Sequence, residues 1–126
     1  MPLAMLVEDN AMNRKLLRDI MEIRFEVLEA ETAERALELL QGRRPDLLLV
    51  DLQLPGMDGL TLMRRLKQDP ATADIPVVAI SAHAMQDDIN QAMESGCAEY
   101  VTKPLVEDPF TFVERMVRLA SGPDGP

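Results

Sequence analysis

The sequence predicts a single α/β domain in which a parallel β-sheet is covered by helices on both faces. Apolar strand-like runs alternate with amphipathic stretches five times along the chain, which is typical of a (βα)5 arrangement. Several runs are apolar at consecutive positions, as expected for strands that are buried on both faces. The 126 residues suffice for one hydrophobic core, and no linker or second domain is expected.

The chain opens with the apolar run Leu3–Val7, which predicts the first strand, and with a periodic stretch near Ala11–Ile23, which predicts the first helix. A second strand is expected at Glu26–Ala30. The helix after it should begin at a capping Thr32 and end before Gly42. Its apolar residues follow the i, i+3, i+4, i+7 spacing of one helical face: Ala33, Ala36, Leu37 and Leu40.

The middle of the chain repeats this alternation. The run LLLVD predicts a buried third strand at Leu47–Asp51, and a weaker periodicity predicts a helix over Gly59–Gln68. The fourth strand is expected at Val77–Ser81. The next helix should end before Gly96, and it carries apolar residues at helical spacing: Met85, Ile89, Ala92 and Met93.

A fifth strand is expected at Glu99–Thr102. The last helix should start with Asp108 as its cap and Pro109 at its first position, and its apolar residues are Val113, Met116, Val117 and Ala120. The final residues, GPDGP at 122–126, are expected to fray, so the domain is expected to span residues 1–121.

Composition argues against several classes of function. Thirteen Lys and Arg against 22 Asp and Glu give a net charge of −9, which disfavours nucleic acid and anionic membranes as direct partners. No apolar stretch approaches the roughly 20 residues of a membrane span, and the start MPLAMLVEDN lacks the basic region of a signal peptide. We therefore expect a cytoplasmic protein. The single cysteine, Cys97, is expected to be a small core residue.

Polar residues follow four of the five expected strands. Glu8 and Asp9 follow the first strand, Asp51 ends the third, Ser81 ends the fourth and Lys103 follows the fifth. In open parallel sheets the ligand crevice lies outside the carboxyl ends of the strands. If the first and third strands are neighbours, these five side chains meet at one edge.

Three converging carboxylates repel one another unless a cation lies among them or some are protonated. Oxygen ligands with room for water suit Mg²⁺. A hydroxyl at Ser81 and an ammonium at Lys103 add groups that bind anions, so the set predicts phosphoryl transfer. Asp51, at the centre of this edge, is the candidate covalent acceptor.

Four segments carry a resemblance to a known family: VEDN at 7–10, DLQLPGMDG at 51–59, PVVAISAHAM at 76–85 and GCAEYVTKP at 96–104. In order and spacing they resemble the receiver domain of two-component response regulators. The similarity is greatest to stand-alone receivers of the DivK and CheY sort and to the receivers of hybrid histidine kinases. It implies a flavodoxin-like strand order 2-1-3-4-5.

The resemblance also implies residue roles. Asp51 would accept a phosphoryl group from a phosphohistidine of a kinase or phosphotransferase. The residues that would hold Mg²⁺, or Mn²⁺ as a substitute, are Glu8, Asp9, Asp51 and the backbone carbonyl of Gln53. Lys103 and Ser81 would bind the phosphoryl group, and the bond from Lys103 to Pro104 would be cis.

Output is implied as well. Tyr100 would turn inward as Ser81 moves. This movement would change the face formed by the fourth helix, fifth strand and fifth helix. That face would bind a downstream protein target or form a phosphorylation-dependent dimer. The resemblance implies a signalling domain and not an enzyme, with self-phosphorylation and slow autodephosphorylation at most. Two departures stand out: most relatives have Thr at the Ser81 position, and the Arg24-Phe25 pair lacks a usual glycine, which predicts a shorter turn.

Three alternatives stay open at the level of sequence. A haloacid-dehalogenase-like phosphatase would also use a magnesium-bound aspartyl phosphate, but it requires a second aspartate where this chain has Gln53. A degenerate receiver would bind partners without phosphorylation, although every charged group is present. The chain could also be a receiver excised from a hybrid histidine kinase. His83, two residues past Ser81, is expected to be an exposed loop side chain.

Overall fold

In a computed structural model, which describes residues 1–83 and 85–121, five parallel strands form one sheet in the order β2-β1-β3-β4-β5. This confirms the strand order implied by the resemblance. The strands have the bounds that the sequence predicts: β1 Leu3–Val7, β2 Glu26–Ala30, β3 Leu47–Asp51, β4 Val77–Ser81 and β5 Glu99–Thr102. Because β1 and β3 are direct neighbours, the residues after β1 lie beside the end of β3.

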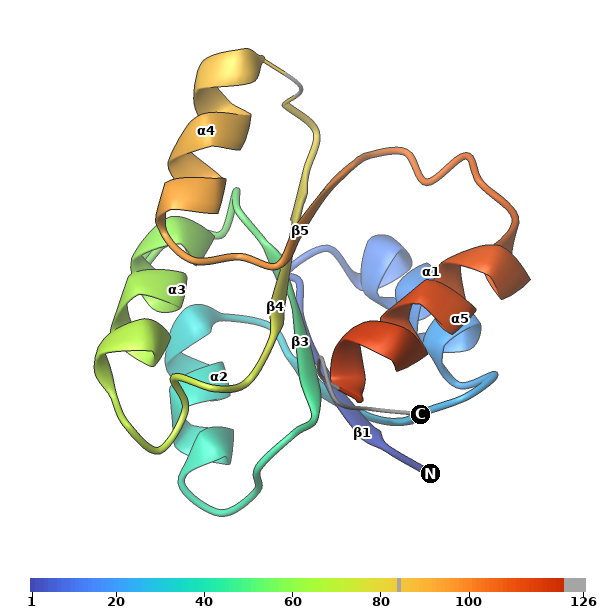
Figure 1. Cartoon of the computed structure of the whole chain (residues 1–126), viewed down its shortest axis with the longest axis horizontal. Helices are drawn as coiled ribbons and strands as arrows, with labels where there is room; N and C mark the ends of the chain where they lie inside the picture. The colour runs from blue at the N-terminus through green and yellow to red at the C-terminus, as the bar shows by residue number, and fades with distance from the viewer. Residues whose placement is uncertain (84, 122–126) are drawn as a thin grey trace.

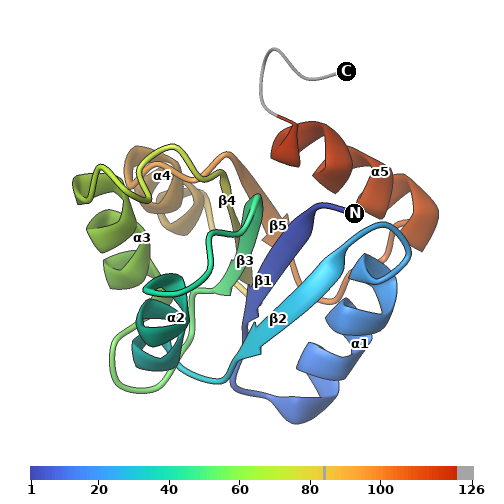
Figure 2. The same cartoon turned by 90° about the horizontal axis from the view of Figure 1, so that it is seen from below.

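Five helices cover the sheet: α1 Ala11–Met21, α2 Ala33–Leu40, α3 Gly59–Gln68, α4 Gln86–Glu94 and α5 Pro109–Ala120. Figure 1 shows α2, α3 and α4 on one face of the sheet and α1 and α5 on the other. The view in Figure 2 shows the same three layers from a second direction. The described part of the chain therefore has the doubly wound α/β architecture that the sequence predicts.

Alternate residues of each central strand enter two separate hydrophobic cores. In β1, Met5 and Val7 join the core beneath α2, α3 and α4, whereas Ala4 and Leu6 join the core beneath α1 and α5. Every residue of β1, β3 and β4 is buried. Burial on both faces is the reason that these strands read as continuous apolar runs in the sequence.

Local signals set most helix ends. The side chains of Thr32 and Asp108 accept backbone hydrogen bonds at the starts of α2 and α5, as predicted. The first helix ends at Met21, two residues before the predicted end, because the chain turns through a bend in which the Phe25 N–H donates to the Met21 carbonyl. No non-glycine residue within the described ranges has a positive φ, so this turn forms without the missing glycine.

Helix α4 departs in part from its predicted packing. Only Ala92 of its apolar face is fully buried, whereas Met85 and Met93 are exposed. The helix exists, but its apolar face covers less of the core than its periodicity suggests. The predicted frayed tail, 122–126, lies outside the described residues. None of the described helices has the length and apolar character needed to cross a membrane.

Candidate functional site at the carboxyl edge of the sheet

Three carboxylates meet at the carboxyl edge of the sheet. Val7 pairs with Val50, which brings the residues after β1 beside Asp51 at the end of β3. Ligand atoms of Glu8, Asp9 and Asp51 all lie within 4.8 Å of one another. Three hard oxygen donors at this spacing, one of them on an exposed residue, fit a Mg²⁺ ion that keeps part of its water shell.

The first carboxylate is the most buried of the three. Glu8 is 1% exposed and Asp51 is 5% exposed, whereas Asp9 is open to solvent. The Glu8 backbone continues the sheet, because its N–H donates to the carbonyl of Ala30 at 3.0 Å. Its carbonyl in turn accepts from the Arg14 guanidinium at 3.0 Å. The sheet and α1 together hold Glu8 at the edge with little freedom.

Lys103 bridges the two buried carboxyl groups. Its Nζ lies 2.7 Å from Glu8 Oε1 and 2.9 Å from Asp51 Oδ2. The peptide bond from Lys103 to Pro104 is cis, as the resemblance implied. The Lys103 backbone N–H also donates to the Ser81 carbonyl at 2.8 Å, so β4 fixes where this ammonium projects. A cation from one strand end therefore bridges acids from two others.

These contacts shift the pKa values of Glu8 and Asp51 in opposite directions. Burial, followed by the adjacent Asp51 carboxylate, raises the pKa of Glu8 to about 7, although Lys103 lowers it. Burial also acts to raise the pKa of Asp51, but hydrogen bonds with Glu8, Lys103 and the Gln53 N–H outweigh it and hold this pKa below its usual value of 3.8. Burial lowers the pKa of Lys103, and its bonds to Glu8 and Asp51 more than offset this, so that its pKa is raised. Asp51 is consequently the anion and Lys103 the cation of the site.

The loop after β3 holds the Asp51 carboxylate from a second side. The Gln53 N–H donates to Asp51 Oδ1 at 2.8 Å, which leaves Oδ2 to Lys103. Gly56 turns the chain with φ 71°, a conformation that favours glycine. Gly59, at the start of α3, passes so close to the backbone of Asp51 that a Cβ there would overlap the Asp51 carbonyl oxygen. The loop thus returns tightly against the strand end that carries the carboxylate.

A second hydrogen-bond cluster surrounds Ser81. This side chain is fully buried, and its Oγ accepts from Gln53 Nε2 at 2.7 Å and from the His83 N–H at 3.0 Å. The Tyr100 hydroxyl donates to the His83 carbonyl at 2.6 Å. His83 is exposed, as predicted. The structure therefore connects Ser81 to Tyr100 through the backbone of one loop residue.

The comparisons with known proteins agree with this geometry. The sequence pattern of the response regulator receiver domain matches residues 4–113. The chain belongs to this family. The polar-differentiation response regulator DivK of Brucella anthropi is 41% identical over 102 residues, which cover 80% of this chain and 83% of the relative. The receiver domain is thus a signalling domain of two-component systems.

Two solved structures are similar over more than nine tenths of their length. The receiver domain of a signal transduction histidine kinase from Syntrophus aciditrophicus superimposes with a TM-score of 0.87 at 28% identity and covers 100% of this chain and 95% of its own. The Mn²⁺-bound form of the response regulator Rcp1 superimposes with a TM-score of 0.80 at 28% identity, covering 92% and 91%. Both support the receiver fold.

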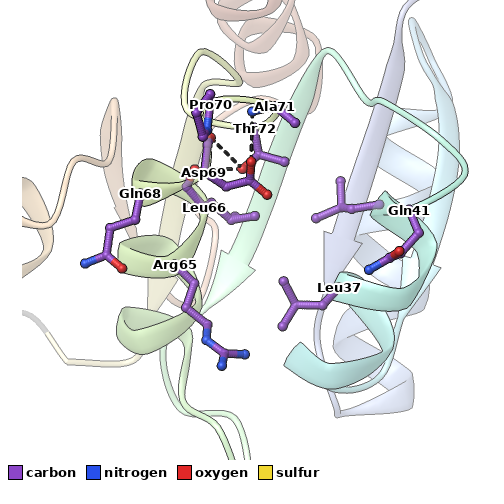
Figure 3. Close-up of a pocket in the computed structure, with 10 residues that line it drawn as sticks. Leu37, Gln41, Arg65, Leu66, Gln68, Asp69, Pro70, Ala71 and Thr72 are labelled. Carbon is purple, nitrogen blue, oxygen red and sulfur yellow. Dashed lines mark hydrogen bonds between the residues drawn. The ribbon is translucent and has the colours of Figure 1, made fainter.

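The acidic site of this receiver domain lies apart from a larger hollow. A cavity of about 800 Å³ lies at the opposite edge of the sheet, between the end of α2 and the segment after α3, as Figure 3 shows. Its lining includes Leu37, Gln41 and Arg65, and the polar groups of Asp69 and Thr72 are engaged in local hydrogen bonds. By contrast, only about 140 Å³ is open beside Ser81. The acidic cluster of Glu8, Asp9 and Asp51 does not line the larger cavity.

Sequence reasoning located the charged groups but missed some of their supports. It assigned Gln53 through its backbone carbonyl and overlooked its side chain, and it gave no role to Gly59 or to Asn10, which caps α1 through the Asn13 N–H. A capping asparagine directly before the first periodic helix was a usable signal. The contacts of Gln53 and Gly59 leave no signal in the sequence, because they join residues that are adjacent only in the folded chain.

Proposed function

We propose that this receiver domain accepts a phosphoryl group onto Asp51 from the phosphohistidine of a kinase or phosphotransferase. An Asp51 carboxylate oxygen forms the new bond to phosphorus, the phosphorus–nitrogen bond breaks, and the histidine ring leaves with that electron pair. The observation that supports this most directly is the pairing of Asp51 with Lys103, since it keeps the acceptor ionised and places a cation beside the incoming group.

Charge is the main obstacle to this reaction, because a phosphoryl dianion approaches three carboxylates. The residues that would hold Mg²⁺, or Mn²⁺ in its place, are Glu8, Asp9, Asp51 and the backbone carbonyl of Gln53. When bound, the metal supplies positive charge that offsets this repulsion. The Mn²⁺-bound form of Rcp1 supports a divalent cation in this family.

The remaining residues bind and orient. The Lys103 ammonium can pair with a phosphoryl oxygen from where it now bridges Glu8 and Asp51. Ser81, which ends the adjacent strand, donates a hydrogen bond from its hydroxyl to a second phosphoryl oxygen. Any self-phosphorylation from small donors, and any slow loss of the group to water, would take place at this same carboxylate.

An apolar surface beside the site suits the phosphodonor protein. Met12 and Leu16 on α1 are 82% and 55% exposed. Leu16 also lines an apolar cavity of about 350 Å³, together with Leu17 of α1 and with Pro104 and Leu105 after β5. A partner seated here would bring its phosphohistidine over the carboxyl edge. The downstream target, or a second copy, would use the face of α4, β5 and α5, which includes Tyr100.

Mass spectrometry tests the proposal. The protein is incubated with acetyl phosphate and Mg²⁺, and one phosphoryl group is expected on Asp51. Asp51→Asn should remain unlabelled, whereas the matched control Asp74→Asn, at an exposed position, should be labelled like the parent. Unchanged mass in the parent, or labelling that persists in Asp51→Asn, would contradict the assignment. Continued turnover of added phosphate esters would instead favour a phosphatase.

A further inference from the structure

The side chain of Gln53 makes two hydrogen bonds that the acceptor chemistry leaves unexplained. Its Nε2 donates to Ser81 Oγ at 2.7 Å, and its Oε1 accepts from the Ala82 N–H at 3.3 Å. A backbone N–H only donates, so the amide oxygen must face Ala82 and the amide nitrogen must face Ser81. We refer to this pair of bonds as the Gln53 bridge.

The backbone of Gln53 is held beside Asp51, the candidate acceptor. The Gln53 N–H donates to Asp51 Oδ1 at 2.8 Å, and the Leu52 N–H donates to the Ile80 carbonyl at 2.9 Å, which continues the pairing of β3 with β4. One residue therefore contacts the Asp51 carboxylate through its backbone and the end of β4 through its side chain.

The Gln53 bridge restricts the position of the Ser81 hydroxyl. The hydroxyl oxygen has two acceptor positions, and these are occupied by Gln53 Nε2 and by the His83 N–H at 3.0 Å. The serine side chain is completely buried in the folded chain. Rotation of Ser81 to another staggered rotamer would carry Oγ away from both donors. The Gln53 bridge accordingly favours one position of the hydroxyl.

The same bonds reach Tyr100. The backbone of His83 donates to Ser81 Oγ and accepts from the Tyr100 hydroxyl at 2.6 Å. A cavity of about 140 Å³ is lined by Gln53, Ser81, His83 and Tyr100 together. Movement of Ser81 would therefore disturb a connected set of bonds that ends at this tyrosine.

We propose that the Gln53 side chain is a positioning residue that restrains Ser81 in the unphosphorylated domain, and that its bridge must break before the Ser81 hydroxyl moves to a phosphoryl group on Asp51. This inference rests on the proposed function. Because the bridge stabilises only the unphosphorylated arrangement, it opposes the response to phosphorylation. A hydrogen bond of this kind is worth about a two- to tenfold shift in an equilibrium.

Gln53→Met tests the restraint, because methionine is unbranched and of similar length but cannot form either bond. Beryllofluoride with Mg²⁺ serves as the phosphoryl mimic, and the NMR signals of Ala82, His83 and Tyr100 report the response. The midpoint concentration of beryllofluoride should fall about two- to tenfold in Gln53→Met. Gln68→Met, an exposed substitution at the opposite edge, should leave it unchanged.

The same substitution in a Ser81→Ala variant distinguishes a restraint on Ser81 from a general effect of Gln53 on the site. In Ser81→Ala the hydroxyl is gone and Tyr100 should no longer respond, so for this comparison the midpoint is read in both backgrounds from the amide signals of Asp51 and Leu52, beside the bound beryllofluoride. Adding Gln53→Met to Ser81→Ala should leave this midpoint unchanged. An equal decrease in both backgrounds would overturn the inference, because it would show that Gln53 acts without Ser81. A midpoint that is unchanged or raised in Gln53→Met alone would also overturn it, with the proposed function intact. If the parent itself gives no response to beryllofluoride, both proposals fall.

Discussion

Gly59 packs directly against Asp51, since a methyl group on its α carbon would overlap the Asp51 carbonyl oxygen and lie 2.9 Å from Leu52 Cα. These atoms are backbone, so they cannot move aside as the end of a flexible side chain could. The first residue of α3 and the candidate acceptor are consequently held in one rigid unit. The requirement for glycine here is steric, because no positive φ is involved.

Gly59→Ala should therefore lower the free energy of unfolding by about 1–3 kcal/mol, as overpacking does elsewhere. Urea denaturation measures this. Gly42→Ala is the matched control, because a Cβ at Gly42 would meet nothing within 4 Å. Equal stability of the two variants would show that the loop after β3 relaxes without cost.

Lys103→Met should also destabilise the protein, because it leaves Glu8 and Asp51 without their shared cation. Loss of one partner from a fully buried pair costs about 3–5 kcal/mol, and the partial exposure of Lys103 reduces the expectation to about 1–3 kcal/mol. Lys15→Met removes an exposed pair with Asp19 and should cost under about 1 kcal/mol. Similar losses in the two variants, measured by urea denaturation, would contradict a buried bridge.

The pH dependence of stability should follow Glu8. Its pKa is about 7 in the folded protein against 4.5 ordinarily, so the folded state keeps a proton that the unfolded state releases between these values. Stability should thus fall as pH rises from about 4.5 to 7, by at most about 3 kcal/mol. The lowered pKa of Asp51 acts in the opposite sense, but only below its usual value of 3.8.

Denaturation across this pH range, in EDTA so that no metal competes, measures the slope. Glu8→Gln carries no titrating proton and should lack this contribution, and it should gain stability over the parent near pH 8. A parent curve that is flat or rises between pH 5 and 7, and that Glu8→Gln does not change, would refute the assignment.

Metal affinity should depend more on Asp9 than on Glu8. Asp9 is exposed and can approach an ion, whereas Glu8 is buried and engaged with Lys103. Asp9→Asn should weaken Mg²⁺ binding by about tenfold or more, which corresponds to about 1.4 kcal/mol. Calorimetric titration compares this variant with Glu8→Gln, for which a smaller loss is expected, and with the distant Asp19→Asn as control. Unaltered binding in both site variants would remove the carboxylates as ligands.

Ser81→Ala should separate acceptance from output. The variant keeps Asp51 and Lys103, so it should still gain a phosphoryl group from acetyl phosphate. Without the hydroxyl, however, the segment linked to Tyr100 through His83 should no longer respond. NMR shifts of residues 85–120 with beryllofluoride report this, and a response equal to that of the parent would show that another group couples Asp51 to this face.

The sequence alone determined the architecture, because each element carries its own local signal. Apolar strand-like runs, largely continuous in β1, β3 and β4, predicted all five strands with their observed bounds, and Thr32 and Asp108 predicted two helix starts. Placement of polar residues after the strands also predicted the edge at which the candidate site lies. Parallel strands bring their carboxyl ends to one side of a sheet, so this prediction required only that the first and third strands be neighbours.

Only the tertiary structure decided how the site is held together. The shared cation of Glu8 and Asp51, the overlap that excludes a side chain at Gly59, and the bonds from Gln53 to Ser81 all join residues that lie on different strands or loops. Residue types allow each of these contacts but do not specify them. Their distances follow from the β1–β3 and β3–β4 pairing and from the close packing of the loops above it.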